Sequence, residues 1–365
     1  MNIPKIIQHF KKLDWFLILT VFLLSVFGLI IQYSLGMFSG LGIFWRQVIY
    51  ALVSFLFMFV FSFLNISLID RKKIRLVYYI FCVILLFLII FGTITRGAKS
   101  WIDFGIVKFQ PSEIVKIISI FLISDFWFRN FSKKLKLKKI VLNFILIFPA
   151  IFLILIQPDF GSAIIIFLIW GLYILTLDRN ILHYLFFLVF GILSLFILWN
   201  FVFTEEQQGR INTFVDPQSD LLDSGYQVRQ SMIAIGSGGI FGKGFGSGLQ
   251  SQLKFLPDSS NDFVFAALSE EFGFVGGSLL LLLFFILFYR IFLITKKSKN
   301  SFESLISLGI LFLFFIQIFI NIGMNLGIMP VTGISLPFIS SGGSNLLASF
   351  ICIGILLSLD VSYKK

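Results

Sequence analysis

Long runs of apolar residues alternate along the chain with short polar segments. A helix needs roughly 20 apolar residues to cross the hydrocarbon core of a bilayer, which is about 30 Å thick. The pattern predicts an all-α polytopic membrane protein with about ten transmembrane helices, near residues 15–36, 44–67, 75–95, 112–128, 140–156, 161–177, 181–203, 262–293, 302–327 and 340–361. The first run is too long for a signal peptide and lacks a small-residue cleavage site, so we expect it to be retained.

The composition supports this class. Hydrophobic residues make up 58% of the 365 residues, charged residues 13%, and the mean hydropathy is +1.00. A water-soluble fold of this composition would expose more apolar surface than water tolerates. Cys82 and Cys352 lie in apolar runs without a CxxC motif or a histidine cluster, so no disulfide framework or zinc site is indicated. With only two histidines, a histidine-based catalytic relay is not expected.

The distribution of Lys and Arg predicts the orientation of the chain. Cytoplasmic loops of membrane proteins carry an excess of these residues. A cytoplasmic N-terminus places most of the 29 basic residues on inner segments, which favours an N-in, C-in topology with an even number of spans. The net charge of +11 is then explained by this topology and by anionic lipid headgroups, so nucleic-acid binding is not expected.

We expect a single membrane domain, residues 1–365, with one long outer loop, 204–261, between the seventh and eighth spans. Loops this long are usually functional or disordered. Residues 226–235 have the pattern of a helix that lies on the membrane interface. The glycines of 236–248 indicate either a flexible hinge or a close approach of the backbone to a ligand. A phosphate loop is not indicated, because Lys243 is followed by Gly244 rather than Ser or Thr.

Three carboxylates lie where the loop enters the eighth span. Asp262 is expected at the membrane surface, whereas Glu270 and Glu271 lie inside the apolar run. A carboxylate at mid-bilayer costs roughly 2.5 kcal/mol or more, so such groups persist chiefly where they are paired or used. Lys116 lies about 6 Å inside the fourth span and Glu270 about 12 Å inward from Asp262. We therefore hypothesise that Lys116 pairs with Glu270 or Glu271; the alternative is a snorkelling lysine.

Position alone allows a structural role for Asp262. Residues 259–262 are all favourable helix N-caps, and an acid there complements the helix dipole. Asp262 is therefore either a cap or a chemically active group.

Five segments carry a resemblance to a known family. They are RGAKSWIDFGIVKFQPSEIVKI (96–117), QPDFGSA (157–163), GYQVRQSMIAIGSGGIFGKGFG (225–246), FLPDSSNDFVFAALSEEFGF (255–274) and NIGMNLGIMPVTGISLPFISSGGS (321–344). Together and in this order they resemble the SEDS family, ten-span bacterial proteins of shape, elongation, division and sporulation. The VTGISLPFIS segment is more similar to the elongation branch than to the division branch.

The resemblance implies a peptidoglycan glycosyltransferase that polymerises lipid II, with inversion, outside the bacterial cytoplasmic membrane during elongation and shape maintenance. It also implies that Asp262 is catalytic, because this residue occupies the position of the aspartate in the family motif LPE-x-HTDF. It further implies a class B penicillin-binding protein, a transpeptidase, and other elongation complex proteins as partners, with membrane lipids around the chain.

The chain departs from the family pattern in several places. Asp258 replaces the Glu of the motif, and Ser260 and Asn261 replace its His and Thr. Ser100 and Ser341 replace an Arg and a Tyr that are common in the family.

The reaction needs a base for the attacking sugar hydroxyl and cations for the leaving diphosphate. A carboxylate at the start of a helix, such as Asp262, can supply the base. The cations expected on the outer side are Arg46, Arg96, Lys99, Arg210, Arg229, Lys243 and Lys254. Asp159, in the short QPDFG turn, is either a turn former or a substrate contact. We predict substrate binding by Arg46, Arg96, Lys99, Asp159, Arg210 and Lys243.

Other functions fit some of these features. No ligand spacing indicates a metal site, although a divalent cation such as Mg²⁺ or Mn²⁺ would suit a diphosphate. A lipid II flippase or transporter would also use intramembrane charges and the Gly and Pro breaks of residues 330–337. A scaffold that recruits a partner enzyme and a polymerase of the division type are the remaining alternatives.

Overall fold

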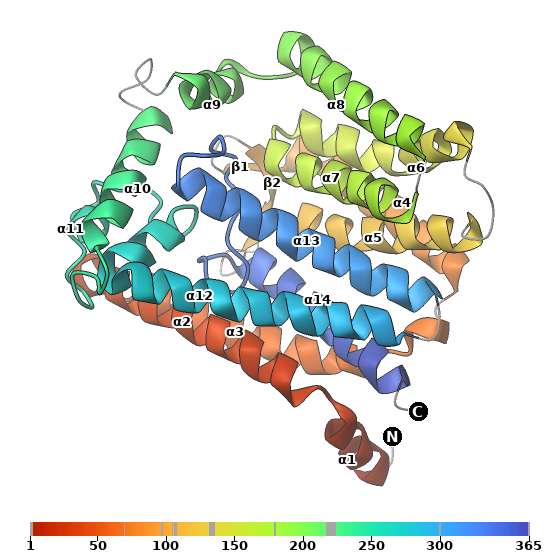
Figure 1. Ribbon diagram of the computed structural model, residues 1–365, viewed down its shortest axis with the longest axis horizontal. Helices are drawn as coiled ribbons and strands as arrows, with labels where there is room; N and C mark the ends of the chain where they lie inside the picture. Colours follow the sequence, from red (N-terminus) through yellow and green to blue (C-terminus); the bar gives the residue numbers. More distant parts are fainter. Residues whose placement is uncertain are drawn as a thin grey trace. The chain divides into compact units, whose positions relative to one another are not determined.

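The computed structural model describes residues 3–68, 70–95, 98–103, 105, 108–130, 136–178, 180–216, 224–298 and 301–363. Across these ranges most residues lie in α-helices (Figure 1), and nine helices are long and apolar enough to cross a membrane. The prediction of an all-α polytopic membrane protein is confirmed. The nine helices are α2 (Trp15–Ser39), α3 (Gly42–Ser62), α4 (Arg71–Phe91), α6 (Leu137–Ile156), α7 (Phe160–Leu177), α8 (Ile181–Phe201), α12 (Val264–Lys297), α13 (Ser301–Asn325) and α14 (Gly343–Tyr363).

The remaining predicted span, 112–128, corresponds to α5 (Pro111–Asn130). This helix is long enough to cross a bilayer but carries four charged residues, which form two ion pairs. Lys116 pairs with Glu113 at 2.7 Å, and Arg129 pairs with Asp125 at 2.8 Å. Because most residues of α5 are buried within the protein, its charges meet protein partners rather than lipid.

Shorter elements precede or connect the long helices. They are α1 (Ile3–Lys12), the 3₁₀ helix η1 (Ile66–Leu68), α9 (Glu205–Val215), α10 (Ser224–Gly238) and α11 (Leu249–Gln252). The helix α10 covers residues 226–235, where a helix was predicted.

A small antiparallel sheet separates α4 from α5, and the sequence pattern did not predict it. It has the order β1 (Thr93–Thr95), β2 (Ala98–Asp103), β3 (Lys108–Phe109), with Thr93 opposite Trp101. The third span was expected to reach residue 95, but α4 ends at Phe91. Gly92 closes this helix with its N–H bonded to the Leu88 carbonyl at 2.7 Å, and its extended backbone leads into β1.

The chain divides into two compact units. Unit 1 comprises Met1–Ile66, Gly209–Ser298 and Gln317–Lys365, and unit 2 comprises Ser67–Gln208 and Lys299–Ile316. In unit 2, α5 packs on α4, α6 and α7.

Within unit 1, α14 packs along α3, and α12 packs along α2 and α10 (Figure 1). Gly354 of α14 lies so close to α3 that a Cβ there would be 2.5 Å from the Met58 carbonyl oxygen. Small residues at such contacts allow two membrane helices to approach closely.

The glycine-rich stretch 236–248 packs against a kink in α12. Gly273 interrupts that helix with φ 63° and ψ −160°. In a regular helix the N–H groups of Phe274 and Val275 would bond to the carbonyls of Glu270 and Glu271. Here Phe274 donates to the carbonyl of Gly239 at 2.9 Å, and Val275 donates to that of residue 240 at 3.1 Å.

The same stretch also satisfies the carbonyls that the kink leaves without their helical donors. Lys243 N–H donates to the Glu270 carbonyl and Gly244 N–H to the Glu271 carbonyl, both at 3.0 Å. A Cβ on Gly242 would lie 2.1 Å from the Glu271 carbonyl oxygen, so only glycine fits there. Within this stretch, Gly238 and Gly242 lie against the backbone of α12, whereas the hinge and the ligand approach considered from the sequence stay predictions for the other glycines.

This packing predicts opposite effects for two glycines of α10. A Cβ on Gly238 would lie 2.0 Å from the Ser269 carbonyl oxygen, whereas nothing lies within 4 Å of one on Gly236. We expect Gly238→Ala to lower the free energy of unfolding by about 1–3 kcal/mol through overpacking. Gly236→Ala should leave it unchanged or raise it by about 0.5–1 kcal/mol, because alanine favours the helix. Thermal unfolding of both purified variants in detergent tests this, and equal melting temperatures would contradict the described contact.

Candidate active site

Asp262 lies in the turn that precedes α12, and its side chain is only 8% exposed. The N-cap of α12 is Phe263, which makes no side-chain capping bond. The first-turn N–H of Ala266 instead bonds to Oδ1 of Asn325 in α13, at 3.0 Å. The capping group therefore comes from another helix, and the cap interpretation of Asp262 is not what the structure shows.

Two buried asparagines of α13 hold the backbone of Asp262. The Nδ2 atoms of Asn321 and Asn325 each donate to the Asp262 carbonyl oxygen at 3.0 Å. Both side chains are fully buried. A buried carbonyl without a partner is costly, so these bonds fix this peptide in one place.

The two residues before Asp262 are held in the same way. The Ser260 carbonyl accepts from Nε2 of Gln32 in α2 at 2.7 Å and from Ser341 N–H at 2.9 Å. The Asn261 carbonyl accepts from Oγ of Ser340 at 2.5 Å. The hydroxyl of Ser341 also contacts that of Ser260 at 3.4 Å, so two departures from the family pattern lie side by side.

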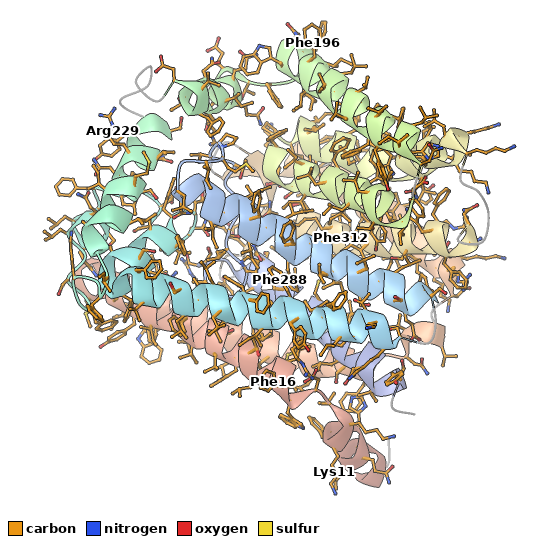
Figure 2. The ribbon with its side chains drawn as sticks, viewed as in Figure 1. Lys11, Phe16, Phe196, Arg229, Phe288 and Phe312 are labelled. Atoms are coloured by element: carbon orange, nitrogen blue, oxygen red, sulfur yellow. The ribbon has the colours of Figure 1, made fainter. Side chains whose placement is uncertain are left out.

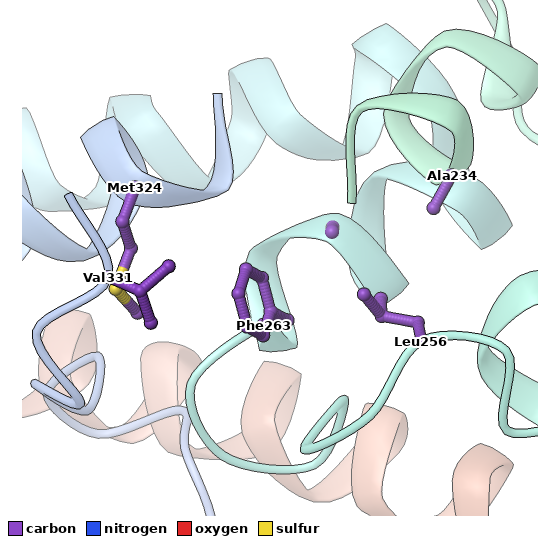
Figure 3. Packing of buried hydrophobic residues seen from close by; sticks show 6 residues of the cluster. Ala234, Leu256, Phe263, Met324 and Val331 are labelled. Carbon is purple, nitrogen blue, oxygen red and sulfur yellow. The ribbon is translucent and has the colours of Figure 1, made fainter. Parts of the chain in front are cut away.

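A hydrophobic cluster anchors the residue that follows Asp262 (Figure 3). Phe263 is fully buried and packs with residues from α10, from the turn that contains residue 256, from α12, from α13 and from the segment after α13. These partners are Ala234, Leu256, Ala266, Met324 and Val331. The turn is thus held by apolar packing on one side and by hydrogen bonds on the other.

The carboxylate of Asp262 lies between its own turn and the segment after α13. Its Oδ1 accepts from Nδ2 of Asn261 at 2.9 Å. Gly333, in the left-handed region at φ 71°, faces the other oxygen: a Cβ there would lie 3.8 Å from Oδ2. The absence of a side chain at Gly333 leaves space beside the carboxylate.

Glu270 is fully buried and bonded to the segment before the turn. Its Oε1 accepts from Lys243 Nζ at 3.1 Å and from Gln250 N–H at 2.9 Å. Its Oε2 accepts from the N–H and the hydroxyl of Ser251 at 3.1 and 2.9 Å. These backbone donors belong to the first turn of α11, where unpaired N–H groups favour an anion.

The predicted pairing of Lys116 with Glu270 or Glu271 is wrong. Lys116 is paired with Glu113, and Glu270 with Lys243. Oε1 of Glu271 accepts from the Ser34 hydroxyl and from Gln252 Nε2. Lys116 does not snorkel either, because it is only 2% exposed. The missed signal was the spacing of three residues between Glu113 and Lys116, which places them on one face of a helix.

Asp159 caps α7. Its Oδ1 accepts from Ser162 N–H at 3.0 Å, and its Oδ2 accepts from Gln110 Nε2 at 2.8 Å and Ser112 Oγ at 3.2 Å. The turn-forming interpretation is therefore confirmed, while a contact of Asp159 with substrate stays a prediction.

The predicted cations are divided between the two units. Unit 1 holds Asp262 and the cations Arg46, Arg210, Arg229, Lys243 and Lys254. Of these, Arg229 is exposed on α10 (Figure 2), and Arg46 and Lys254 are exposed as well. Lys99 is exposed in unit 2, whereas Arg96 lies outside the described residues. Their roles in substrate binding stay predictions. In the described part of the chain, no group of three or more His, Cys, Asp or Glu side chains is placed to hold a metal ion.

The sequence interpretation missed Asn321 and Asn325. These two residues lie four apart within an apolar run, so they share one face of a helix. Polar groups inside a membrane span are rare and commonly functional, and this was the available signal.

We predict an energetic coupling between Lys243 and Glu270. Lys243→Met leaves a buried carboxylate without its cation, and Glu270→Gln removes the charge that needs one. In thermal or denaturant unfolding, the double variant should therefore differ from the sum of the single variants by about 0.5–3 kcal/mol. Lys254→Met, combined with Glu270→Gln, is the matched control and should be additive. Additivity in both cycles would show that the ion pair contributes nothing.

The chain matches a family model described as cell cycle protein, of the FtsW, RodA and SpoVE type, over residues 14–365. It is 40% identical to the peptidoglycan glycosyltransferase MrdB of Escherichia coli K12, over 78% of this chain and 77% of the relative. It is 35% identical to the probable peptidoglycan glycosyltransferase FtsW of Wigglesworthia glossinidia brevipalpis (100% and 97%). It is 34% identical to the stage V sporulation protein E of Bacillus subtilis 168 (95% and 96%).

Solved structures share the fold. The crystal structure of the rod shape determining protein RodA from Thermus thermophilus matches with a TM-score of 0.69 at 24% identity, over 97% of this chain and 98% of that one. A chain of a peptidoglycan synthase complex matches with a TM-score of 0.77 at 24% identity, over 97% and 99%. The order of motifs, the family model and the similar relatives agree: the chain belongs to the SEDS family of membrane proteins, which includes FtsW, RodA and the stage V sporulation protein E.

Proposed function

We propose that this chain is a peptidoglycan glycosyltransferase that polymerises lipid II at the outer face of the bacterial cytoplasmic membrane. Relatives at 40% and 35% identity carry this activity in their names, one of them as probable. The observation that carries the proposal is the state of Asp262, a carboxylate in a rigidly held turn that does not serve as the cap of α12.

In the proposed reaction Asp262 acts as the general base. A sugar hydroxyl of one substrate attacks the anomeric carbon of the other, and its proton passes to the carboxylate as the new C–O bond forms. The bond from the anomeric carbon to the diphosphate oxygen breaks on the opposite face, so the configuration inverts and the diphosphate leaves with the electron pair. A carboxylate is a weak base in water, so its placement must supply much of the effect, typically about 10²–10⁴-fold.

The cations are proposed to bind the diphosphate. Arg46, Arg210 and Lys243 are the candidates in the unit that holds Asp262, and Lys243 is also paired with Glu270. Lys99 and Asp159 are also proposed to contact substrate. Cationic groups placed where negative charge develops stabilise the transition state.

The cellular role is proposed to be cell elongation and shape maintenance. The identity of 40% to MrdB exceeds that of 35% to FtsW, which favours this role over division. A class B penicillin-binding protein is the proposed partner, because the resemblance implies one and because the fold also occurs in a peptidoglycan synthase complex that coordinates polymerization and crosslinking.

Polymerisation by purified protein in detergent tests the proposal. Wild-type protein, supplied with its cognate transpeptidase and labelled lipid II, should make glycan strands, and Asp262→Asn should reduce the rate by at least about 10²-fold. Asp258→Asn is the matched control, because Asp258 is an exposed residue of the same turn whose positive φ suits asparagine. It should retain the wild-type rate.

The outcomes separate the alternatives. Detergent has no second leaflet, so a flippase would yield no glycan even as wild type. A scaffold would show the same rate with Asp262→Asn as with wild type when the complex is assayed. Wild-type speed in Asp262→Asn would also reject Asp262 as the base.

A further inference from the structure

Three asparagines surround Asp262 and each makes a defined hydrogen bond to it. We propose that Asn261, Asn321 and Asn325 are positioning residues that fix the Asp262 carboxylate for proton transfer. This inference rests on the proposed function, because the three residues can position a base only if Asp262 is that base.

The two residues of α13 fix the peptide of Asp262. Each donates to its carbonyl oxygen at 3.0 Å, and each makes a second bond that fixes its own amide. Nδ2 of Asn321 also donates to the Ile334 carbonyl at 2.8 Å, and Nδ2 of Asn325 to the Asn321 carbonyl at 2.8 Å. Because no atom of either side chain reaches solvent, neither amide can exchange these bonds for water.

Asn325 also decides how the first turn of α12 is capped. Its Oδ1 accepts the Ala266 N–H, a bond that an Asp or Ser near a helix start would ordinarily make with its own side chain. Asn325 thus bonds to the backbone carbonyl of Asp262 and also caps the first turn of α12.

Asn261 acts on the carboxylate itself. Its Nδ2 lies 2.9 Å from Oδ1 of Asp262, so the amide orients the carboxylate plane. Asn261 should therefore hold the carboxylate in the orientation that proton transfer needs.

Steady-state kinetics of leucine and alanine variants test the proposal. For Asn321→Leu and Asn325→Leu, we expect kcat to fall about 10–100-fold with KM for lipid II within about twofold, because misplacing a reacting group costs rate rather than binding. Asn143→Leu is the matched control, since Asn143 is a buried asparagine of α6 whose side-chain atoms have no hydrogen-bond partner among the residues that the structure describes. It should leave kcat unchanged. Melting temperatures and the folded fraction are measured for each variant.

Asn261→Ala provides a second readout that does not depend on the buried helix. Residue 261 lies in the turn at the edge of the buried region, so this variant is expected to fold. Its kcat per folded molecule should fall about 10–100-fold while KM for lipid II stays within about twofold of the wild-type value. A purely structural role would lower the folded fraction without this fall in kcat.

Either of two results overturns the proposal while Asp262→Asn is inactive. One is a kcat per folded molecule that is unchanged in Asn321→Leu and Asn325→Leu. The other is an unchanged kcat per folded molecule in Asn261→Ala, which decides the matter alone if the leucine variants do not fold. If Asp262→Asn is fully active, the proposed function fails instead, so the two failures are distinguishable.

Discussion

Peptide groups that leave the helical pattern within an apolar protein must find partners, because no water is available to satisfy them. In unit 1 the backbone around α12 departs from the helical hydrogen-bond pattern twice, in the turn before Val264 and at Gly273. At both places, segments distant in the sequence supply the hydrogen-bond partners. Side chains of α2 and α13 and the segment after α13 bond to the turn, and the glycine-rich stretch completes the hydrogen bonds at the kink. The geometry of the site in unit 1 depends on these two sets of hydrogen bonds.

These hydrogen bonds have a functional consequence. Peptides held by several buried bonds do not reorient at low cost, so Asp262 is presented in one conformation. Near the kink, the buried side chain of Glu270 is also held in place. It accepts hydrogen bonds from Lys243 and from the first turn of α11. A charge that would be costly in lipid is thereby compensated within the protein. Asp262, in the turn before α12, and Glu270, inside α12, are held by different segments and serve different purposes.

Much of this architecture is predictable from the sequence because it depends on local pattern. Apolar runs specify the spans to within a few residues, and the motif around residues 255–263 singles out Asp262. The partners are less predictable, because they depend on which segments meet in space. The partner of Lys116 was assigned to the eighth span although Glu113 lies one turn away from Lys116. The glycines of 236–248 were interpreted as a hinge or as a close approach of the backbone to a ligand, and only the structure shows that Gly238 and Gly242 lie against the backbone of α12. The sheet before α5 was missed because a helical span was extended through its first strand.

The most direct test of the account is the turnover of Asp262→Glu. This variant keeps a carboxylate but moves it by one methylene within a turn that the structure describes as fixed. The account predicts glycan synthesis that is about 10²-fold slower than wild type, yet retains the acid limb of the pH profile, because the base is present but misplaced. A wild-type rate for Asp262→Glu would show that the turn does not set the position of the acid, and would contradict the central claim.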